Sequence, residues 1–188
     1  MIIRTERLVL RAWRDSDFIA FASMHMDPAV MVDTPPLADL AECEPKFLRY
    51  QAAYHAHGFC RWLVAEPDGA FVGYTGIMPI RSGHPVGAGV ELGWRLVRRT
   101  WGRGYATEAA RGALKDGFER IGFPEVLSYT TPDNVRSQAV MGRLGLERRS
   151  ERDFVDHSVS YWPMGGMVWV ARPPLHIEGS RARVRRPL

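Results

Sequence analysis

Two glycines one residue apart, Gly102 and Gly104, lie among arginines in the segment RRTWGRGYATEA, directly before a predicted helix. The N–H groups of such a loop, together with the positive end of the helix, favour a bound anion, because glycine lets a ligand approach the backbone. Alternatively, the glycines only shape a strand-to-helix turn. Arg98, Arg99 and Arg103 favour the anion-binding interpretation, since they add positive charge around the loop.

Two common nucleotide-binding loops do not fit this chain. A dinucleotide fingerprint, GxGxxG, needs a third glycine where Thr107 stands, and the segment GAGVEL has Leu92 at that place. Neither segment contains the GxxxxGK[ST] pattern of a P-loop. The remaining hypothesis is a backbone cradle for an anion.

The elements on either side of the glycines must position this loop. In VELGWRLV, residues 90–97, apolar side chains alternate with others, which predicts a core strand with Glu91 on the face opposite the apolar one. Residues 105–121 carry apolar and small side chains at helical spacing, including Ala109, Ala110 and Ala113. We therefore expect a strand, the loop, and a helix packed closely on a sheet.

The rest of the chain predicts a mixed α/β fold, with a mostly antiparallel central sheet flanked by helices, over residues 1–171. No internal repeat or second domain is visible. The first half of the chain is expected to form a strand in residues 2–13, a helix in 14–25, a loop in 27–37 and a helix in 38–58. Asp15 or Ser16 would cap the first helix, and Pro45 would split or delay the second. The other expected elements are an antiparallel pair in 59–66 and 70–80, a strand in 125–131, a helix in 135–145 and final strands in 158–164 and 167–171.

Composition and charge narrow the class of protein. The chain has 188 residues, 46% of them hydrophobic, and its two cysteines, Cys43 and Cys60, predict reduced packing residues rather than disulfides or metal ligands. No long apolar run occurs and charges interrupt the first ten residues, so we expect a cytoplasmic protein with no membrane segment. His55 and His57 do not share a helix face, and no metal is expected.

The net charge of +4 is concentrated at one end. Residues 172–188 contain five arginines and one glutamate, which leaves 20 basic and 20 acidic side chains in residues 1–171. A dedicated nucleic-acid binder carries its basic excess on a folded face, so nucleic acid is a disfavoured partner and the tail is expected to be a solvated, mobile end. A nucleic-acid role through the tail stays as a third hypothesis.

The segment VELGWRLVRRTWGRGYATEAARGAL resembles the acetyl-CoA signature of the GNAT superfamily of N-acetyltransferases, since residues 99–104 match its R/Q-x-x-G-x-G/A motif. Other segments resemble, in the expected order, the branch of ribosomal-protein N-terminal alanine and serine acetyltransferases. They are TERLVLR at 5–11, DP at 27–28, WLVAEPDGAFVGYTG at 62–76 and PDNVRSQAVMGRLGL at 132–146. The resemblance covers nearly all of residues 1–170.

This resemblance implies the GNAT acyl-CoA N-acyltransferase fold and acetyl-CoA as co-substrate. The pyrophosphate would lie on the loop N–H groups, and pantetheine would pair with the preceding strand as if it were an added strand. The residues expected to bind acetyl-CoA are Leu96, Val97, Arg98, Arg99, Gly102, Arg103, Gly104, Tyr105, Ala106, Thr107, Asn134 and Arg143.

The resemblance also implies direct attack of a primary amine on the thioester in a ternary complex, with a strand N–H near Trp94 to Leu96 stabilising the oxyanion. Glu91 is the candidate base; the alternatives are a water chain, or a structural carboxylate paired with Arg95 or another arginine. Ser137 would hydrogen-bond the leaving thiolate or cap its helix.

Three further positions near Ser137 have competing interpretations. Many family members have a tyrosine as general acid where this chain has Met141, which puts a tyrosine acid in doubt. Asn134 would contact pantetheine or the thiol, or only form a turn. Arg143 would meet a CoA phosphate or only complement its helix end.

The acceptor is not encoded in a readable motif. It is expected to be a peptide N-terminus, with a ribosomal-protein N-terminus implied by the branch, or a small-molecule amine. A homodimer is left open. The alternative function is a non-catalytic acyl-CoA-binding or regulatory domain, which Met141 favours.

Overall fold

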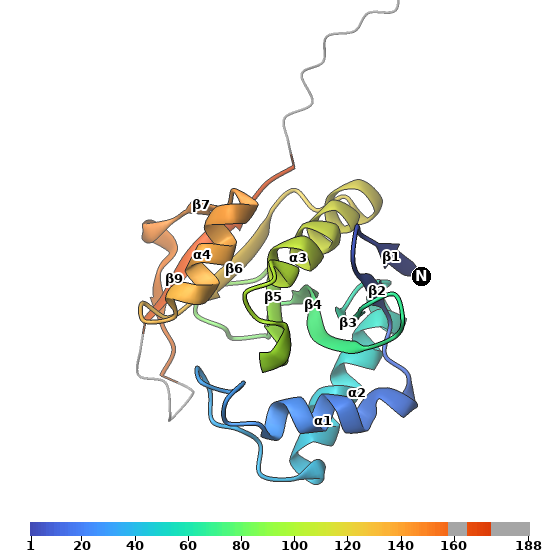
Figure 1. Cartoon of the computed structure of the whole chain (residues 1–188). Coiled ribbons are helices and arrows are strands. Elements are labelled where there is room, and N and C mark those ends of the chain that lie inside the picture. The colour runs from blue at the N-terminus through green and yellow to red at the C-terminus, as the bar shows by residue number, and fades with distance from the viewer. Residues whose placement is uncertain (158–164, 174–188) are drawn as a thin grey trace, which may run out of the picture.

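The computed structural model describes residues 1–157 and 165–173 and contains one curved sheet with helices on both sides (Figure 1). The strand order is β1-β2-β3-β4-β5-β6-β9-β7, and β8 pairs with β9. Only β5 and β6 are parallel; the other pairs are antiparallel, which confirms the predicted mixed α/β fold. The strands are β1 Ile2–Arg4, β2 Val9–Arg11, β3 Arg61–Ala65, β4 Phe71–Pro79, β5 Val90–Leu96, β6 Val126–Thr130, β7 Glu147–Arg148, β8 Phe154–Val155 and β9 Gly165–Ala171.

In the described residues, four α-helices cover the two faces of the sheet. The helices are α1 Phe18–Met26, α2 Leu40–His57, α3 Tyr105–Asp116 and α4 Val135–Leu144. On β4, the Tyr74 ring contacts His25 of α1 and Tyr50 of α2. Ile77, three residues further along β4, points the other way and lies against Gly117, directly after α3. Because successive strand residues face opposite sides, α1 and α2 cover one face, and α3 with its neighbour α4 covers the other (Figure 1).

Small side chains let α3 approach the sheet closely, as the sequence predicts. Ala109, Ala110 and Ala113 are almost fully buried. A Cβ added to Gly112 would lie 3.0 Å from the Thr5 side chain, so the first strands pack directly on this helix. The predicted helix in residues 105–121 ends in a π-helical turn, Gly117–Ile121.

The structure corrects two expectations near the N-terminus. The single strand predicted in residues 2–13 is a hairpin, because Thr5 N–H donates to Leu8 O at 2.9 Å and closes a turn. Neither Asp15 nor Ser16 caps α1, since both lie in a 3₁₀ turn before it and Asp17 occupies the N-cap position.

Pro45 neither splits nor delays α2, contrary to expectation. Asp39 caps the helix by accepting a hydrogen bond from Glu42 N–H at 2.9 Å. Pro45 lies early in α2, so it withholds one helical hydrogen bond, from the carbonyl of the exposed Ala41, which water can satisfy. The helix ends at Gly58 in the left-handed region, as predicted.

Other expectations are confirmed or lie beyond the described residues. Cys43 and Cys60 are buried free thiols. Predicted strand 167–171 lies within β9, and the helix in 135–145 is α4, which ends at Gly145 as predicted. The strand predicted in 158–164 and the tail from residue 174 lie outside the described residues.

Candidate active site

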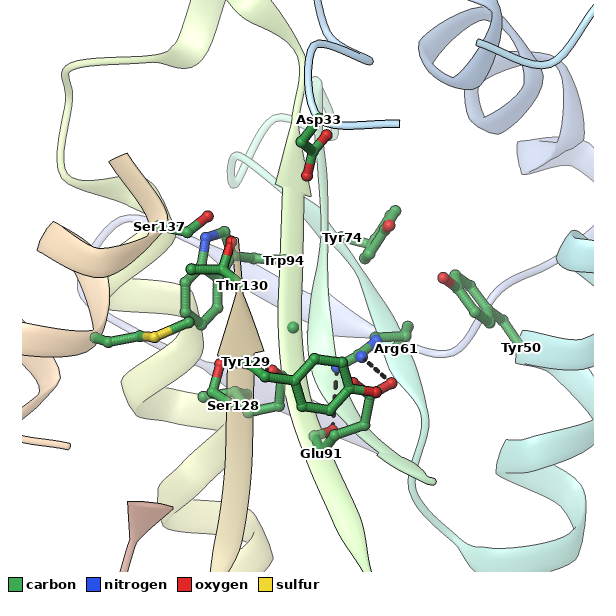
Figure 2. Close-up of a pocket in the computed structure, with 13 residues that line it drawn as sticks. Asp33, Tyr50, Arg61, Tyr74, Glu91, Trp94, Ser128, Tyr129, Thr130 and Ser137 are labelled. Carbon is green, nitrogen blue, oxygen red and sulfur yellow. Dashed lines mark hydrogen bonds and ion pairs between the residues drawn. The ribbon is translucent and has the colours of Figure 1, made fainter. Parts of the chain in front are cut away.

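A gap opens between the two parallel strands at the centre of the sheet. β5 and β6 pair only where Glu91 faces Leu127, and Ser128 Oγ donates to Leu92 O at 3.0 Å. Beyond this point the strands separate around a cavity of about 160 Å³. Ser137 and Met141 of α4 line it from one face of the sheet, whereas Tyr50 of α2 lines it from the other (Figure 2). The cavity therefore connects the two faces.

The edge of β5 that borders the gap has backbone groups free for a ligand. Leu92 O points towards β6, whereas Val97 N–H donates to Val72 O on the β4 side at 3.0 Å. Because backbone groups alternate along a strand, Trp94 and the N–H of Leu96 also face the gap. Leu96 O accepts a hydrogen bond from Trp101 Nε1 at 2.8 Å. An extended ligand could pair with this edge as an added strand.

The glycine loop leads directly from this edge into α3. Gly102 and Gly104 adopt the left-handed region, with φ of 77° and 78°. Within the described part of the chain, no N–H group of residues 102–107 donates a hydrogen bond to another protein group. These donors belong to the loop and the first turn of α3, where the helix dipole is positive. Unpaired N–H groups at a positive helix end are suited to an anion, which is compatible with the prediction made for the residues from Gly102 to Thr107.

Glu108, in the first turn of α3, would repel an anion if its charge were not compensated. Arg7 Nη2 lies 2.6 Å from its carboxylate, and both the Arg7 N–H and the Thr5 hydroxyl donate to it. Arg7 also donates to Arg103 O at 3.1 Å, so the N-terminal hairpin braces the loop. Sequence reasoning missed Arg7, although it lies within the TERLVLR segment.

The arginines predicted around the loop lie in different settings. Arg98 and Arg136 of α4 each place a guanidinium over the Trp101 ring, 5.3 and 4.5 Å from its centroid. Arg99 donates to Phe71 O at 2.6 Å, and Arg103 lies 3.8 Å from Glu66. Arg136 was not anticipated, and it joins α4 to the loop.

The structure does not bring Arg143 to the loop. Its exposed side chain lies in the last turn of α4, and none of the described contacts joins it to residues 96–107. This geometry favours the simpler of the two interpretations, in which Arg143 complements the helix end.

Glu91 lies in the cavity and forms an ion pair with Arg61 of β3. Arg61 Nη2 donates to Glu91 Oε1 at 2.7 Å, and its side chain is only 8% exposed (Figure 2). A Cβ on Gly93 would lie 2.7 Å from this guanidinium, so the glycine makes room for it. Arg61 also donates to the carbonyls of Gly76 and Glu91. The partner of Glu91 is thus Arg61, since Arg95 pairs with Asp33.

Tyr129 of β6 is a hydroxyl near Glu91 that sequence reasoning missed (Figure 2). Burial and the neighbouring Glu91 carboxylate raise its pKa above the usual value, so the phenol stays protonated. Its ring packs against His84 and Phe154, with centroids 5.0 and 5.3 Å apart. Tyr129 can therefore donate a hydrogen bond within the cavity at neutral pH.

On the α4 side, Asn134 caps the helix and Ser137 faces the cavity. Asn134 Oδ1 accepts from Ser137 N–H at 3.1 Å, so the capping role considered for Ser137 belongs to Asn134. Met141 is 1% exposed and lines the cavity where many family members are expected to have a tyrosine. Ser137 is the hydroxyl that α4 contributes to the cavity wall.

A second group of polar side chains surrounds Tyr74 on the α1 and α2 side. Burial opposes ionisation of Tyr74, but the cations Lys46, Arg95 and Arg61 outweigh it and lower its pKa to about 8. Burial raises the pKa of its neighbour Tyr50, whose ring centroid lies 5.4 Å away. At pH 7 the Tyr74 phenol is therefore still mostly protonated, and it ionises at slightly higher pH beside the neutral Tyr50.

Buried His25 stacks on Tyr74, with ring centroids 5.8 Å apart and an interplanar angle of 9°. Its Nδ1 lies 2.9 Å from Phe21 O, so Nδ1 carries the proton, and burial lowers the pKa of the ring to about 3. The sequence pattern could predict that His25 and Lys46 belong to helices, but it could not predict that both lie close to Tyr74.

In residues 1–157 and 165–173, no three His, Cys, Asp or Glu side chains converge as a metal-binding group. No helix of the described chain is both long and apolar enough to cross a membrane.

Comparisons with known proteins concern the family and the fold of the chain. The acetyltransferase (GNAT) domain family matches residues 7–147. The uncharacterized protein YkkB of Bacillus subtilis is 31% identical over 144 residues, covering 76% of this chain and 83% of YkkB. An acetyltransferase from Agrobacterium tumefaciens superimposes with a TM-score of 0.77 at 30% identity, covering 92% of this chain and 95% of its own. RimL, a ribosomal L7/L12 α-N-protein acetyltransferase solved with coenzyme A, shares the fold, with a TM-score of 0.75 at 14% identity and coverage of 92% and 98%.

Proposed function

Because the chain belongs to the GNAT acetyltransferase family, we propose that it transfers the acetyl group of acetyl-CoA to a primary amine. Both the resemblance to this family and the expectation of its fold are confirmed. The observation that carries the proposal is the run of unpaired N–H groups in residues 102–107, next to the open edge of β5.

In this proposal the loop and the strand edge hold the co-substrate. The N–H groups of residues 102–107 bind the pyrophosphate, and the backbone of Trp94 and Leu96 pairs with the pantetheine arm. Acetyl-CoA, when bound, supplies a thioester as acyl donor. A backbone N–H of the β5 edge stabilises the negative charge that develops on the acyl oxygen.

The acceptor reaches the same gap from the α1 and α2 face. An amine is mostly protonated at neutral pH, so its proton must leave before attack. We assign Glu91 to receive this proton, directly or through water, and Ser137 to hydrogen-bond the leaving thiolate. The Arg61 guanidinium already holds one carboxylate oxygen of Glu91, at 2.7 Å, so only part of the carboxylate is open to the amine. Tyr74 is therefore the rival base.

The primary test measures release of free CoA thiol from acetyl-CoA with a panel of amines and peptide N-termini. Turnover with at least one acceptor is expected. Tight CoA binding without thiol release from any acceptor would instead support the alternative, a non-catalytic acyl-CoA-binding or regulatory domain.

A second test separates a base from a structural carboxylate. If Glu91 accepts the proton, Glu91→Gln lowers kcat/KM most at low pH, and the deficit shrinks as rising pH deprotonates the amine in solution. A deficit that is constant with pH would mean a structural role. Glu44→Gln, at an exposed position of α2, serves as the matched control, and Tyr74→Phe tests the rival base by the same profile.

A further inference from the structure

We propose that the acceptor amine carries a negatively charged group, a carboxylate or a phosphate, which binds beside Lys46 and Tyr74 at the α2 side of the cavity. This inference rests on the proposed acetyl transfer, because it defines which amines reach the gap. Nothing in the family match or in the similar proteins assigns this group of side chains.

The carboxylates of the cavity are already neutralised by arginines. Asp33 Oδ1 lies 2.7 Å from Arg95 Nη1, and Glu91 Oε1 lies 2.7 Å from Arg61 Nη2. The two arginines are largely buried, with side chains 13% and 8% exposed, so these ion pairs are poorly screened by solvent. Neither carboxylate is free to bind a positive group of the acceptor.

Lys46 of α2 is a further cation close to Tyr74, although it does not line the cavity itself, and no carboxylate in the described part of the chain forms an ion pair with it. It lies on α2 one turn before Tyr50, so both side chains point towards β4. Its ammonium interacts electrostatically with Tyr74, Arg95 and Arg61, and burial lowers its pKa. No described residue forms an ion pair or a hydrogen bond with it. The exposed Arg49 of α2, whose guanidinium lies over the Tyr50 ring, also acts on Lys46, so four cations face two carboxylates and positive charge is in excess.

Hydrogen-bond donors suited to an anion surround this charge. Tyr50 and Tyr74 line the cavity (Figure 2), and Tyr74 interacts with Lys46. Arg95 Nε is buried and has no hydrogen-bond partner among the described residues. A carboxylate or phosphate oxygen can accept from a phenol and an ammonium together, and such charge-assisted hydrogen bonds are the stronger ones.

The cavity geometry links this anion site to the reaction. Tyr50 and Tyr74 lie on one side of β5, while Trp94 and Ser137 lie towards the other (Figure 2). An acceptor with its anion beside Lys46 would thus extend its amine into the gap. A polyamine would instead place further positive charges beside Lys46, Arg61 and Arg95 with no free carboxylate to balance them.

The test compares amines of similar basicity that differ in charge: 4-aminobutyrate, 3-aminopropyl phosphate, n-butylamine and spermidine. We expect kcat/KM for at least one anionic amine to exceed that for n-butylamine about tenfold or more, with spermidine poorest. Comparing 4-aminobutyrate with 3-aminopropyl phosphate identifies whether a carboxylate or a phosphate is preferred. Equal or better turnover of n-butylamine or spermidine would overturn the inference while leaving acetyl transfer intact.

Variants of Lys46 assign the preference to this site. Lys46→Met keeps the length of the side chain and should bring the ratio of anionic to neutral amine close to one, whereas Lys46→Arg should keep most of it. Lys115→Met removes the only other lysine, which is exposed on α3, and should change nothing. An unchanged ratio in Lys46→Met would refute the assignment.

A binding measurement keeps the inference testable if no amine turns over. Calorimetry with CoA-saturated protein should detect 4-aminobutyrate or 3-aminopropyl phosphate in the wild type and lose the signal in Lys46→Met. Such a result would support the anion site although the proposed activity had failed. Absence of binding by both compounds to the wild type would overturn the inference.

Discussion

Gly104→Val is the sharpest test of the phosphate cradle, because Gly104 has a φ of 78° that a β-branched residue strongly disfavours. The nearest atom to an added Cβ is Arg7 Nη2 at 3.6 Å, an ordinary contact, so steric collision is not the expected cause. Holding a non-glycine residue in the left-handed region costs roughly 1–2 kcal/mol. If the loop relaxes in the free variant, CoA binding must restore the left-handed conformation. That free-energy cost weakens CoA binding about 5- to 30-fold.

The assay is calorimetric titration of CoA, with Gly122→Val as the matched control. Gly122 also has a positive φ, of 83°, and no atom within 4 Å of an added Cβ, but it follows the opposite end of α3. Both variants should lose similar stability, while only Gly104→Val should lose CoA affinity. Arg98→Ala should weaken binding less than threefold, because the loop N–H groups remain in place. A larger loss in Arg98→Ala than in Gly104→Val would refute the backbone cradle.

Three more predictions concern charges beside the cavity. Glu91→Gln should lower the unfolding free energy by about 2 kcal/mol in urea titrations. This loss is smaller than the cost of leaving a buried charge without any partner, because Arg61 keeps two carbonyl acceptors. An unchanged free energy would contradict a buried ion pair. Absorbance near 295 nm should show one tyrosine titrating at about pH 8, and Tyr74→Phe should remove it. Because burial lowers the pKa of His25 to about 3, wild-type stability should fall as pH drops from about 6.5 towards 3, and His25→Phe should flatten that fall.

The cradle could be predicted from the sequence because its function depends on backbone groups. Gly102 and Gly104 indicate positive φ, and the alternation in residues 90–97 places a strand before them. These are local properties, which hydrophobic period and glycine spacing report directly. The same is true of Gly58 and Gly145, which end α2 and α4 as expected.

The partners of each side chain could not be predicted, because they depend on strand register and on which helix covers which face. The pattern placed Glu91 away from the apolar face but left its arginine unidentified. Arg61 becomes that partner only because Gly76 and Gly93 face it in the β3-β4-β5 register. Lys46 and His25 both lie close to Tyr74, which belongs to a strand far from either of them in the sequence, so their role in the site was not visible from the pattern.

The hairpin at residues 2–11 was mispredicted for a similar reason. Its strands have three residues each, too short for alternation to distinguish a turn from one longer strand. The turn itself contains Thr5, whose hydroxyl donates to Glu108 Oε1 at 2.6 Å and also accepts from Leu8 N–H at 3.1 Å. The same residue therefore takes part in the turn and in a contact with α3. A contact between residues so far apart in the sequence cannot be predicted from a local pattern.

Gly93 of β5 connects the two proposals, the role of Glu91 as proton acceptor and the positive charge where the amine binds. Gly93 has no side chain, so the Arg61 guanidinium can lie flat beside β5 and reach Glu91. This ion pair removes Glu91 as an anion that could attract a cationic acceptor. Among the described residues of this face, Lys46 is then a largely buried cation that no carboxylate pairs with. A glycine in β5 therefore supports both proposals, because the arginine that it accommodates holds Glu91 in the cavity and leaves the charge of Lys46 unmatched by that carboxylate.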